Sequence, residues 1–194
     1  MNFSAKNLFP KLILCIAFAT QLVACVPAVV GGAAVGGSMA ADRRTSGIYL
    51  EDENIELKGT RKLEFSLGEN SHTSVTSFNR NVLLTGQVPD EAAKAKAETL
   101  MKEVESVRSI TNELVVGPKT SISTRTSDTY ITSKLKTKFL TENLFSPNHV
   151  KVVTEDSSVF LMGLVTKEEA NAAVEICRTS DGVSKVVKVF EYIN

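Results

Sequence analysis

The chain has 194 residues, of which 43% are hydrophobic and 23% are charged. Its 22 lysine and arginine residues balance 22 aspartate and glutamate residues. This balance excludes a general nucleic-acid binder, which would show a basic excess, and the composition excludes a disordered chain. The length allows one average domain or two small ones.

The first 24 residues are typical of a secretory signal peptide. Lys6 and Lys11 provide a short basic region, and an apolar stretch follows over residues 12–22. That stretch is shorter than the roughly 20 apolar residues that span a bilayer. It ends in Leu22-Val23-Ala24-Cys25, which resembles a bacterial lipobox, in which the cysteine becomes the acylated first residue of the mature protein. The alternative is an uncleaved anchor with Cys25 buried in it.

A lipobox decides the fate of all three cysteines. Cys15 is removed with the signal peptide, and Cys25 carries N-acyl and S-diacylglycerol groups, so no other cofactor is expected. Cys177 is then the only thiol, which excludes an internal disulfide and favours a small buried hydrophobe. Each acyl methylene buried in the membrane contributes about 0.8 kcal/mol. Val26, rather than Asp, follows Cys25, and similarity to lipoproteins of diderm bacteria then implies the periplasmic face of the outer membrane.

A tether is expected over residues 25–46, because the segment after Cys25 is rich in glycine and alanine. Gly32-x-x-x-Gly36 also matches a helix-packing pattern, but the segment is short for a membrane span. It is not a dinucleotide-binding loop, because no strand precedes it.

The rest of the chain contains two copies of one small module. The segment 82–88, VLLTGQV, aligns with 159–165, VFLMGLV, at an offset of 77 residues. Asp52-x-x-Ile55 aligns with Asp128-x-x-Ile131 at an offset of 76. We expect the modules to occupy residues 47–117 and 125–194, with a linker over residues 118–124.

Each copy is predicted to form a helix, two strands, a helix and a strand. In the first copy the helices are expected over residues 50–67 and 90–104, and the strands over residues 74–78, 81–88 and 107–116. In the second copy Asp128 is expected to cap a helix that ends near Thr141 and buries Ile131, Leu135 and Phe139. Its remaining elements are expected over residues 150–154, 159–165, 167–179 and 183–193, and Thr166-Lys167-Glu168-Glu169 forms a capping box before the last helix.

A hydrophobic hairpin that ends in [LM]-x-Gly-x-Val, followed by an acidic helix start and a Val-rich strand, resembles the BON domain. Two such modules behind a lipobox resemble the dual-BON-domain outer-membrane lipoproteins over essentially the whole chain. The resemblance implies an α+β fold of two tandem αββαβ modules, each with a three-stranded mixed sheet and two helices on one face. It also implies a non-enzymatic role in outer-membrane integrity and binding of anionic phospholipid by the second module.

Three positions depart from the pattern. Tyr130 lies where the resemblance leads us to expect Trp, although Tyr keeps an interfacial ring. Gly59 lies in the buried stripe of the first helix and is expected to cost about 1 kcal/mol relative to Ala. Ser106 lies where the second copy has Gly182. The last two indicate that the first module has drifted.

The first helices of the two copies differ in charge. Residues 50–67 carry five acidic and three basic side chains, whereas residues 125–142 carry two acidic and four basic ones. An aromatic ring beside ammonium groups suits anionic headgroups. The predicted phospholipid-binding residues therefore share one flank of the first helix of the second copy, away from Lys136, and are Tyr130, Ser133, Lys134, Thr137 and Lys138. The alternative is a solvated basic face.

Other side chains indicate neither catalysis nor metal binding. His72 and His149 lack further ligands at coordinating spacing, and no nucleophile motif is present. Gly86 and Gly163 are predicted to be structural, at a bulge or a close approach of two backbones. Two hypotheses follow: a lipid-anchored module that binds anionic phospholipid, or a scaffold for envelope proteins in barrel assembly or peptidoglycan remodelling.

Overall fold

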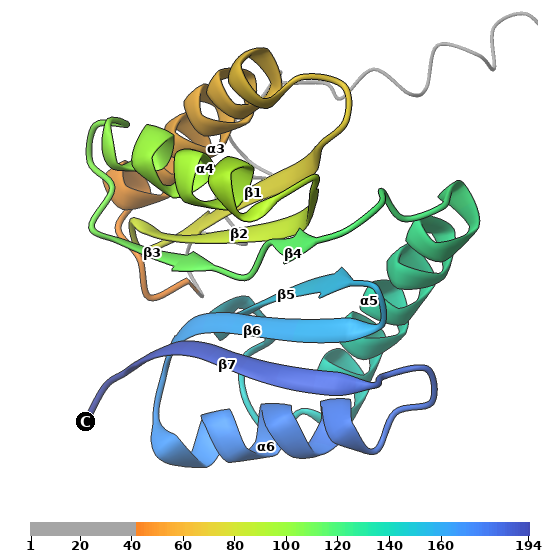
Figure 1. The fold of residues 1–194 in the computed structure, drawn as a ribbon. Coiled ribbons are helices and arrows are strands. Elements are labelled where there is room, and N and C mark those ends of the chain that lie inside the picture. The colour runs from red at the N-terminus through yellow and green to blue at the C-terminus, as the bar shows by residue number, and fades with distance from the viewer. Residues whose placement is uncertain (1–41) are drawn as a thin grey trace, which may run out of the picture. The chain divides into compact units, whose positions relative to one another are not determined.

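The computed structural model describes residues 42–194, so the signal peptide, Cys25 and most of the tether lie outside the described residues. The described part forms two modules with the same order of elements (Figure 1). The first consists of α3 (Ser46–Leu67), β1 (His72–Phe78), β2 (Asn81–Val88), α4 (Glu91–Lys102), β3 (Ser109–Asn112) and β4 (Val115–Val116). The second consists of α5 (Ile122–Glu142), the 3-10 turn η3 (Pro147–His149), β5 (Val150–Glu155), β6 (Ser158–Val165), α6 (Lys167–Arg178) and β7 (Lys185–Tyr192).

Both sheets are mixed, as predicted. In the first module β1 pairs antiparallel with β2, and β3 and β4 pair parallel with β2. In the second, β6 lies between the antiparallel β5 and the parallel β7. The α+β prediction of two αββαβ modules is therefore confirmed, although the last strand of the first module is divided into β3 and β4.

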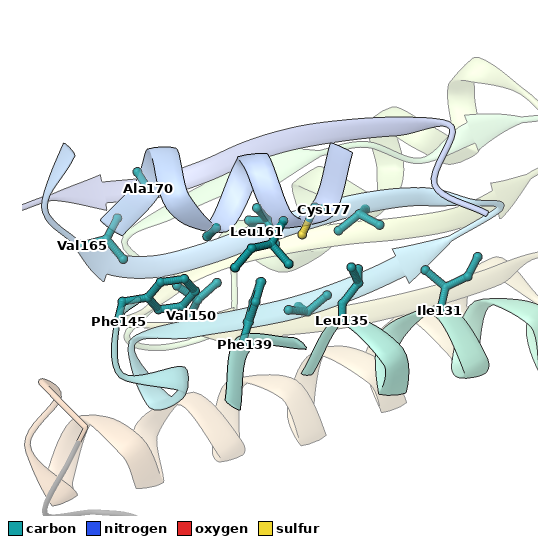
Figure 2. Close-up of a cluster of buried hydrophobic side chains, with 13 residues drawn as sticks. Ile131, Leu135, Phe139, Phe145, Val150, Leu161, Val165, Ala170 and Cys177 are labelled. Carbon is teal, nitrogen blue, oxygen red and sulfur yellow. The ribbon is translucent and has the colours of Figure 1, made fainter. Parts of the chain in front are cut away.

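Each module has its own core between the helices and one face of the sheet. In the second module Ile131, Leu135 and Phe139 of α5 meet side chains of β5, β6 and α6 (Figure 2). Cys177 is buried in this core, and burial raises the pKa of its thiol to about 12, with Lys138 opposing the rise weakly. A thiol with that pKa is protonated near neutral pH and therefore poorly reactive.

A third cluster joins the sheet faces that the helices leave uncovered. It contains Phe78 and Leu83 of the first module and Phe160 and Met162 of the second, all at most 5% exposed. Polar contacts surround it: Lys151 Nζ lies 2.6 Å from Glu56 Oε1, and Gln87 Nε2 donates to Glu155 Oε1 at 2.7 Å. A module of about 70 residues is close to the lower limit for independent folding, so this shared cluster adds burial that neither module has alone.

The predicted role of Asp128 as a helix cap is wrong. The helix α5 begins six residues earlier, at Ile122, and Ser121 is its cap. Asp128 lies inside the helix, 4% exposed, and its two carboxylate oxygens accept hydrogen bonds from Asp156 N and Ser157 N in the β5–β6 turn, each at 2.9 Å. The repeated Asp-x-x-Ile pattern therefore marks a helix that holds its hairpin.

Asp52 has the equivalent role in the first module. It is 2% exposed and accepts hydrogen bonds from Asn79 N and Arg80 N in the β1–β2 turn, at 2.8 and 2.7 Å. In both turns the two residues bonded in this way have positive φ, between 46° and 64°. The carboxylate thus satisfies backbone donors of a turn whose conformation is unfavourable for L-residues.

Glycines show where the two modules tolerate no side chain. A Cβ at Gly86 would lie 2.0 Å from His72 O, and one at Gly163 would lie 2.2 Å from His149 O. Gly86 also has a φ of 113°. The backbone of the residue at or just before the start of the neighbouring strand therefore approaches closely at both positions.

Gly59 is explained by packing rather than by drift. A Cβ there would lie 2.6 Å from Met101 Cε and 3.2 Å from Val75 Cγ1, so the helix α3 makes room for the Met101 side chain. Packing does not explain Ser106 in the same way. Its backbone has a φ of 67°, and the equivalent Gly182 has a φ of 91°. A serine in this region carries backbone strain that glycine avoids.

Candidate functional site

The outward face of α5 carries large apolar side chains that are mostly exposed. The exposed fractions of Ile122, Tyr130 and Leu140 are 76%, 69% and 65%. The helix period places them opposite the buried stripe of Ile131 and Leu135. The helix α5 is therefore apolar on two sides, and only one side is covered by its own module.

Small hydroxyl-bearing residues lie between these apolar residues on the helix surface. Ser133 Oγ donates to Thr129 O at 2.9 Å, and Thr137 Oγ1 donates to Ser133 O at 3.0 Å. Both residues are exposed. The structure thus brings Tyr130, Ser133 and Thr137 together on one face, and Ile122 and Leu140 extend that face at both ends. Sequence reasoning missed these two, although their spacing of 18 residues is five helical turns.

Lys134 and Lys138 lie on the flank of α5 that faces α6, and both ammonium groups have partners. Lys134 Nζ donates to Asp181 O at 2.9 Å, and Lys138 Nζ donates to Ser180 Oγ at 2.8 Å. Both side chains are partly buried. Their hydrogen bonds hold the loop between α6 and β7, so the structure separates these two lysines from the open face.

Two other basic residues lie on the opposite flank. Arg125 is partly buried and Lys136 is exposed, and neither side chain has a hydrogen-bond or ion-pair partner among the described residues. Together with hydroxyl side chains of α5 they line a hollow of about 370 Å³. Sequence reasoning set Lys136 aside because the wheel placed it away from Tyr130.

The equivalent helix of the first module carries a different surface. Asn54 takes the position of Tyr130. The exposed apolar side chains are Leu50, Leu57 and Phe65, at 58%, 50% and 93% exposure. Lys58 and Lys62 pair with Glu105 and Glu103 of their own module. This face is apolar, but its lysines are already neutralised.

The chain that leads into the first module is fastened to both modules by adjacent arginines. Arg43 forms a two-pronged ion pair with Glu169 at 2.6 and 2.9 Å and donates to Leu164 O at 2.7 Å. Arg44 pairs with Asp52 at 2.8 Å, and its guanidinium lies 4.0 Å from the centre of the Phe78 ring. The two arginines therefore fix the end of the tether region against the folded part.

Glu169 is the centre of a polar cluster. Its carboxylate accepts from Arg43, from Thr166 N at 2.9 Å in the predicted capping box, and lies 3.1 Å from His149 Nδ1. Burial alone would raise the pKa of Glu169, but the hydrogen bonds from Arg43, Thr166 and His149 outweigh it and lower the pKa to about 2. The group is therefore ionised throughout the physiological pH range.

Within residues 42–194, no group of three or more His, Cys, Asp or Glu side chains is placed to hold a metal ion. No helix in the same range is both long and apolar enough to cross a bilayer. The predicted lipidation site, Cys25, lies outside the described residues.

Comparison with known proteins identifies the modules. The BON domain profile matches residues 51–118 and 127–194. The chain belongs to the BON-domain family. It is 38% identical to the outer membrane lipoprotein DolP of Haemophilus influenzae over 186 residues, which are 95% of this chain and 96% of the relative.

Two further relatives are more distant. The chain is 35% identical to a 21 kDa hemolysin of Actinobacillus pleuropneumoniae, over 78% of this chain and 79% of the relative. It is 31% identical to the osmotically-inducible protein Y of Escherichia coli, over 72% of each chain. The match over nearly the full length confirms the prediction of a non-enzymatic outer-membrane lipoprotein with two BON domains.

Proposed function

We propose that the second BON module binds anionic phospholipid in the periplasmic leaflet through the outward face of α5, and that the protein thereby supports outer-membrane integrity. The observation that carries this proposal is the exposure of Ile122, Tyr130 and Leu140 on one side of a single helix. A helix with one apolar side in its own core and a second apolar side in water is suited to lie in a membrane interface.

The residue types on this face match an interface. A tyrosine ring buries its apolar body among acyl carbons while its hydroxyl stays near the headgroups. Ser133 and Thr137 have spent their hydroxyl hydrogens on backbone carbonyls, so they add little polarity to the helix surface. Basic groups beside such a face contribute about 1 kcal/mol each toward an anionic surface. Lys134 and Lys138, whose ammonium groups are held by Asp181 and Ser180, contribute to the proposed site only through the positive potential of their flank.

The test is flotation of the mature chain with phosphatidylcholine vesicles that contain or lack phosphatidylglycerol. We expect binding only to the anionic vesicles, and we expect Tyr130→Ala to weaken it severalfold. The matched control is Tyr192→Ala, which removes a 51% exposed tyrosine from β7 and is expected to leave binding unchanged. Equal losses in the two variants would contradict the assignment to α5.

We also propose that Cys25 carries the acyl groups that anchor the chain. Cys25→Ala is expected to leave an unprocessed precursor in place of the acylated protein. Intact-mass measurement of membrane-extracted protein checks this prediction. A mature chain that starts at Cys25 without acyl groups would refute it.

A second candidate function is a scaffold that holds envelope proteins. The observation that favours it is the apolar face of α3, formed by Leu50, Leu57 and Phe65, which lacks the tyrosine of α5. Photo-crosslinking residues placed separately at positions 57 and 140 distinguish the two candidate functions. Protein adducts at Leu57 and lipid adducts at Leu140 would assign one function to each module.

A further inference from the structure

The segment that precedes the first helix contacts both modules. Residues 42–44, called the strap below, lead into Thr45, the cap of α3. Arg43 reaches the second module, where its guanidinium pairs with both carboxylate oxygens of Glu169 at 2.6 and 2.9 Å and donates to Leu164 O at 2.7 Å. These bonds join the strap to α6 and to β6. A two-pronged arginine–carboxylate pair fixes the orientation of both groups.

The neighbouring arginine is held by the first module. The side chain of Arg44 is 7% exposed, and it pairs with Asp42 at 2.7 Å and with Asp52 of α3 at 2.8 Å. Its guanidinium carbon lies 4.0 Å from the centre of the Phe78 ring and 5.0 Å from that of Tyr49. Ion pairs and ring contacts together hold this arginine in place. Adjacent residues of the strap are therefore attached to different modules.

The strap also forms part of the wall of a hollow between the modules. The hollow has a volume of about 430 Å³, and Asp42 and Arg44 line it together with Phe139 and Val150 of the second module. Phe78 lines it as well and belongs to the third cluster, which joins the two sheet faces. Arg44 therefore lies over the edge of that cluster, and movement of the strap would expose apolar side chains between the modules.

The contact between the modules has a small apolar centre and a polar rim. On the side of β7, Glu191 accepts hydrogen bonds from Asn79 and Asn81 and pairs with Arg108. Interfaces of this kind between domains of one chain permit relative motion unless further contacts restrain it. The ion pair of Arg43 with α6 supplies such a restraint at the start of the folded part.

We propose that the strap is a latch with two states, closed as in this structure or released. In the closed state it holds the two modules together and covers one side of the hollow. In the released state Arg43 leaves Glu169, the hollow opens at the strap, and the tether gains the length of the strap. The inference goes beyond membrane binding by α5 and does not depend on it, because the two arginines bond to other elements.

The sequence offers a direct probe of the latch. No lysine or arginine lies between Cys25 and Arg43, so trypsin cleavage after Arg43 or Arg44 separates the two modules from the tether. Trypsin must take the arginine side chain into its own specificity pocket, and both side chains are engaged in the closed state. Cleavage therefore requires release, and at low trypsin concentration its rate follows the population of the released state.

The experiment measures this cleavage in the mature full-length chain, by the mass of the fragment that starts after the strap. Glu169→Gln keeps both tryptic sites and keeps the capping box with Thr166, because Gln serves there as Glu does. We expect this variant to be cleaved about tenfold faster than the wild type. Arg43→Lys keeps the charge and a tryptic site but loses the two-pronged geometry, so we expect an intermediate rate.

The matched control is Glu175→Gln. It breaks an ion pair with Arg178 on the same helix, α6, and we expect cleavage at the strap to keep the wild-type rate. Cleavage inside the modules is followed in the same samples and reports unfolding.

A second measurement follows the hollow itself. Tyr49 lines the hollow beside Arg44, and Tyr49→Trp gives a chain without other tryptophans a single fluorophore there. A tryptophan ring keeps the contact with the guanidinium. We expect acrylamide to quench this fluorescence weakly, and more strongly when Glu169→Gln is added.

Three results would overturn the inference. Cleavage of the Glu169→Gln variant at the wild-type rate would show that the ion pair does not hold Arg43. Equal acceleration in Glu175→Gln, or acceleration matched by cleavage inside the modules, would show a general loosening of the fold. Faster cleavage at the strap without stronger quenching would show that the strap does not close the hollow.

Discussion

The two BON modules share their buried features and differ on the outside of their first helices. Asp52 and Asp128 hold equivalent hairpin turns, and Gly86 and Gly163 mark equivalent close approaches of the backbone, to His72 and His149. On the outside, Tyr130 replaces Asn54. The common features account for the fold, so the differences are where the function of each module must be sought.

The largest expected effect is a loss of stability at the glycines where the fold common to both modules leaves no room for a side chain. Gly163→Val places a side chain against His149 O, where even a Cβ would lie 2.2 Å away, so we expect a loss of about 3 kcal/mol in the free energy of unfolding. Gly86→Val is expected to lose at least as much, because φ is 113° there. Gly117→Ala is the control, since nothing lies within 4 Å of its Cβ. Denaturant unfolding checks all three, and an unchanged midpoint for Gly163→Val would contradict the close approach.

The buried aspartates give the next largest effect. Asp128→Ala removes the acceptor for two turn N–H groups and is expected to cost about 2–3 kcal/mol. Asp128→Asn keeps one acceptor oxygen and should cost less. Hydrogen exchange at Asp156 and Ser157 checks the mechanism, because their amides should lose protection before the rest of the module. Uniform protection in Asp128→Ala would show that the turn does not depend on the carboxylate.

Acid should weaken the second module through Glu169. Its pKa is about 2 in the folded chain, below its ordinary value of 4.5, so its ion pairs stabilise the fold above pH 4.5. That contribution is lost as the pH falls toward 2, and we expect it to be about 2 kcal/mol. Glu169→Gln should be less stable at pH 7 and should lose less stability between pH 5 and pH 2 than the wild type does. Parallel pH profiles for the two proteins would contradict the assigned ion pairs.

The smallest expected effect on stability concerns the position at which the first module has Ser106 and the second has Gly182. Ser106→Gly is expected to stabilise the chain by about 1 kcal/mol, because it relieves a φ of 67°. The reciprocal change, Gly182→Ser, should destabilise by at least as much, since its Cβ would also lie 3.3 Å from Ile131 Cδ1. Thermal melting of both variants checks the pair. A loss of stability in Ser106→Gly would show that the serine makes a compensating contact.

The sequence predicts the hairpins and the second helices well, because their signals are local. Asn81–Val88 is a largely apolar run bounded by turn residues, and Thr166 with Glu169 forms the predicted capping box. The start of α5 is missed because Ser121 is as good a cap as Asp128. The role of Asp128 becomes visible only in the folded structure, where its carboxylate accepts a hydrogen bond from the hairpin turn 28 residues further along the chain.

Part of the candidate site could be predicted as well. The exposure of Tyr130 follows from the period of the buried stripe. The hydrogen-bond partners of Lys134 and Lys138 could not be predicted from that period, because the packing of α6 brings Ser180 and Asp181 beside α5. The pairing of Arg43 with Glu169, across 126 residues, has no local signal at all.

The most direct test of membrane binding by α5 uses the absence of tryptophan from the chain. Tyr130→Trp places one fluorophore on the outward face of α5, and Asn54→Trp places one at the equivalent position of α3. The account predicts that phosphatidylglycerol vesicles shift the emission of the Tyr130→Trp variant to shorter wavelength and leave that of the Asn54→Trp variant unchanged. A shift confined to the Asn54→Trp variant, or none in either, would contradict it.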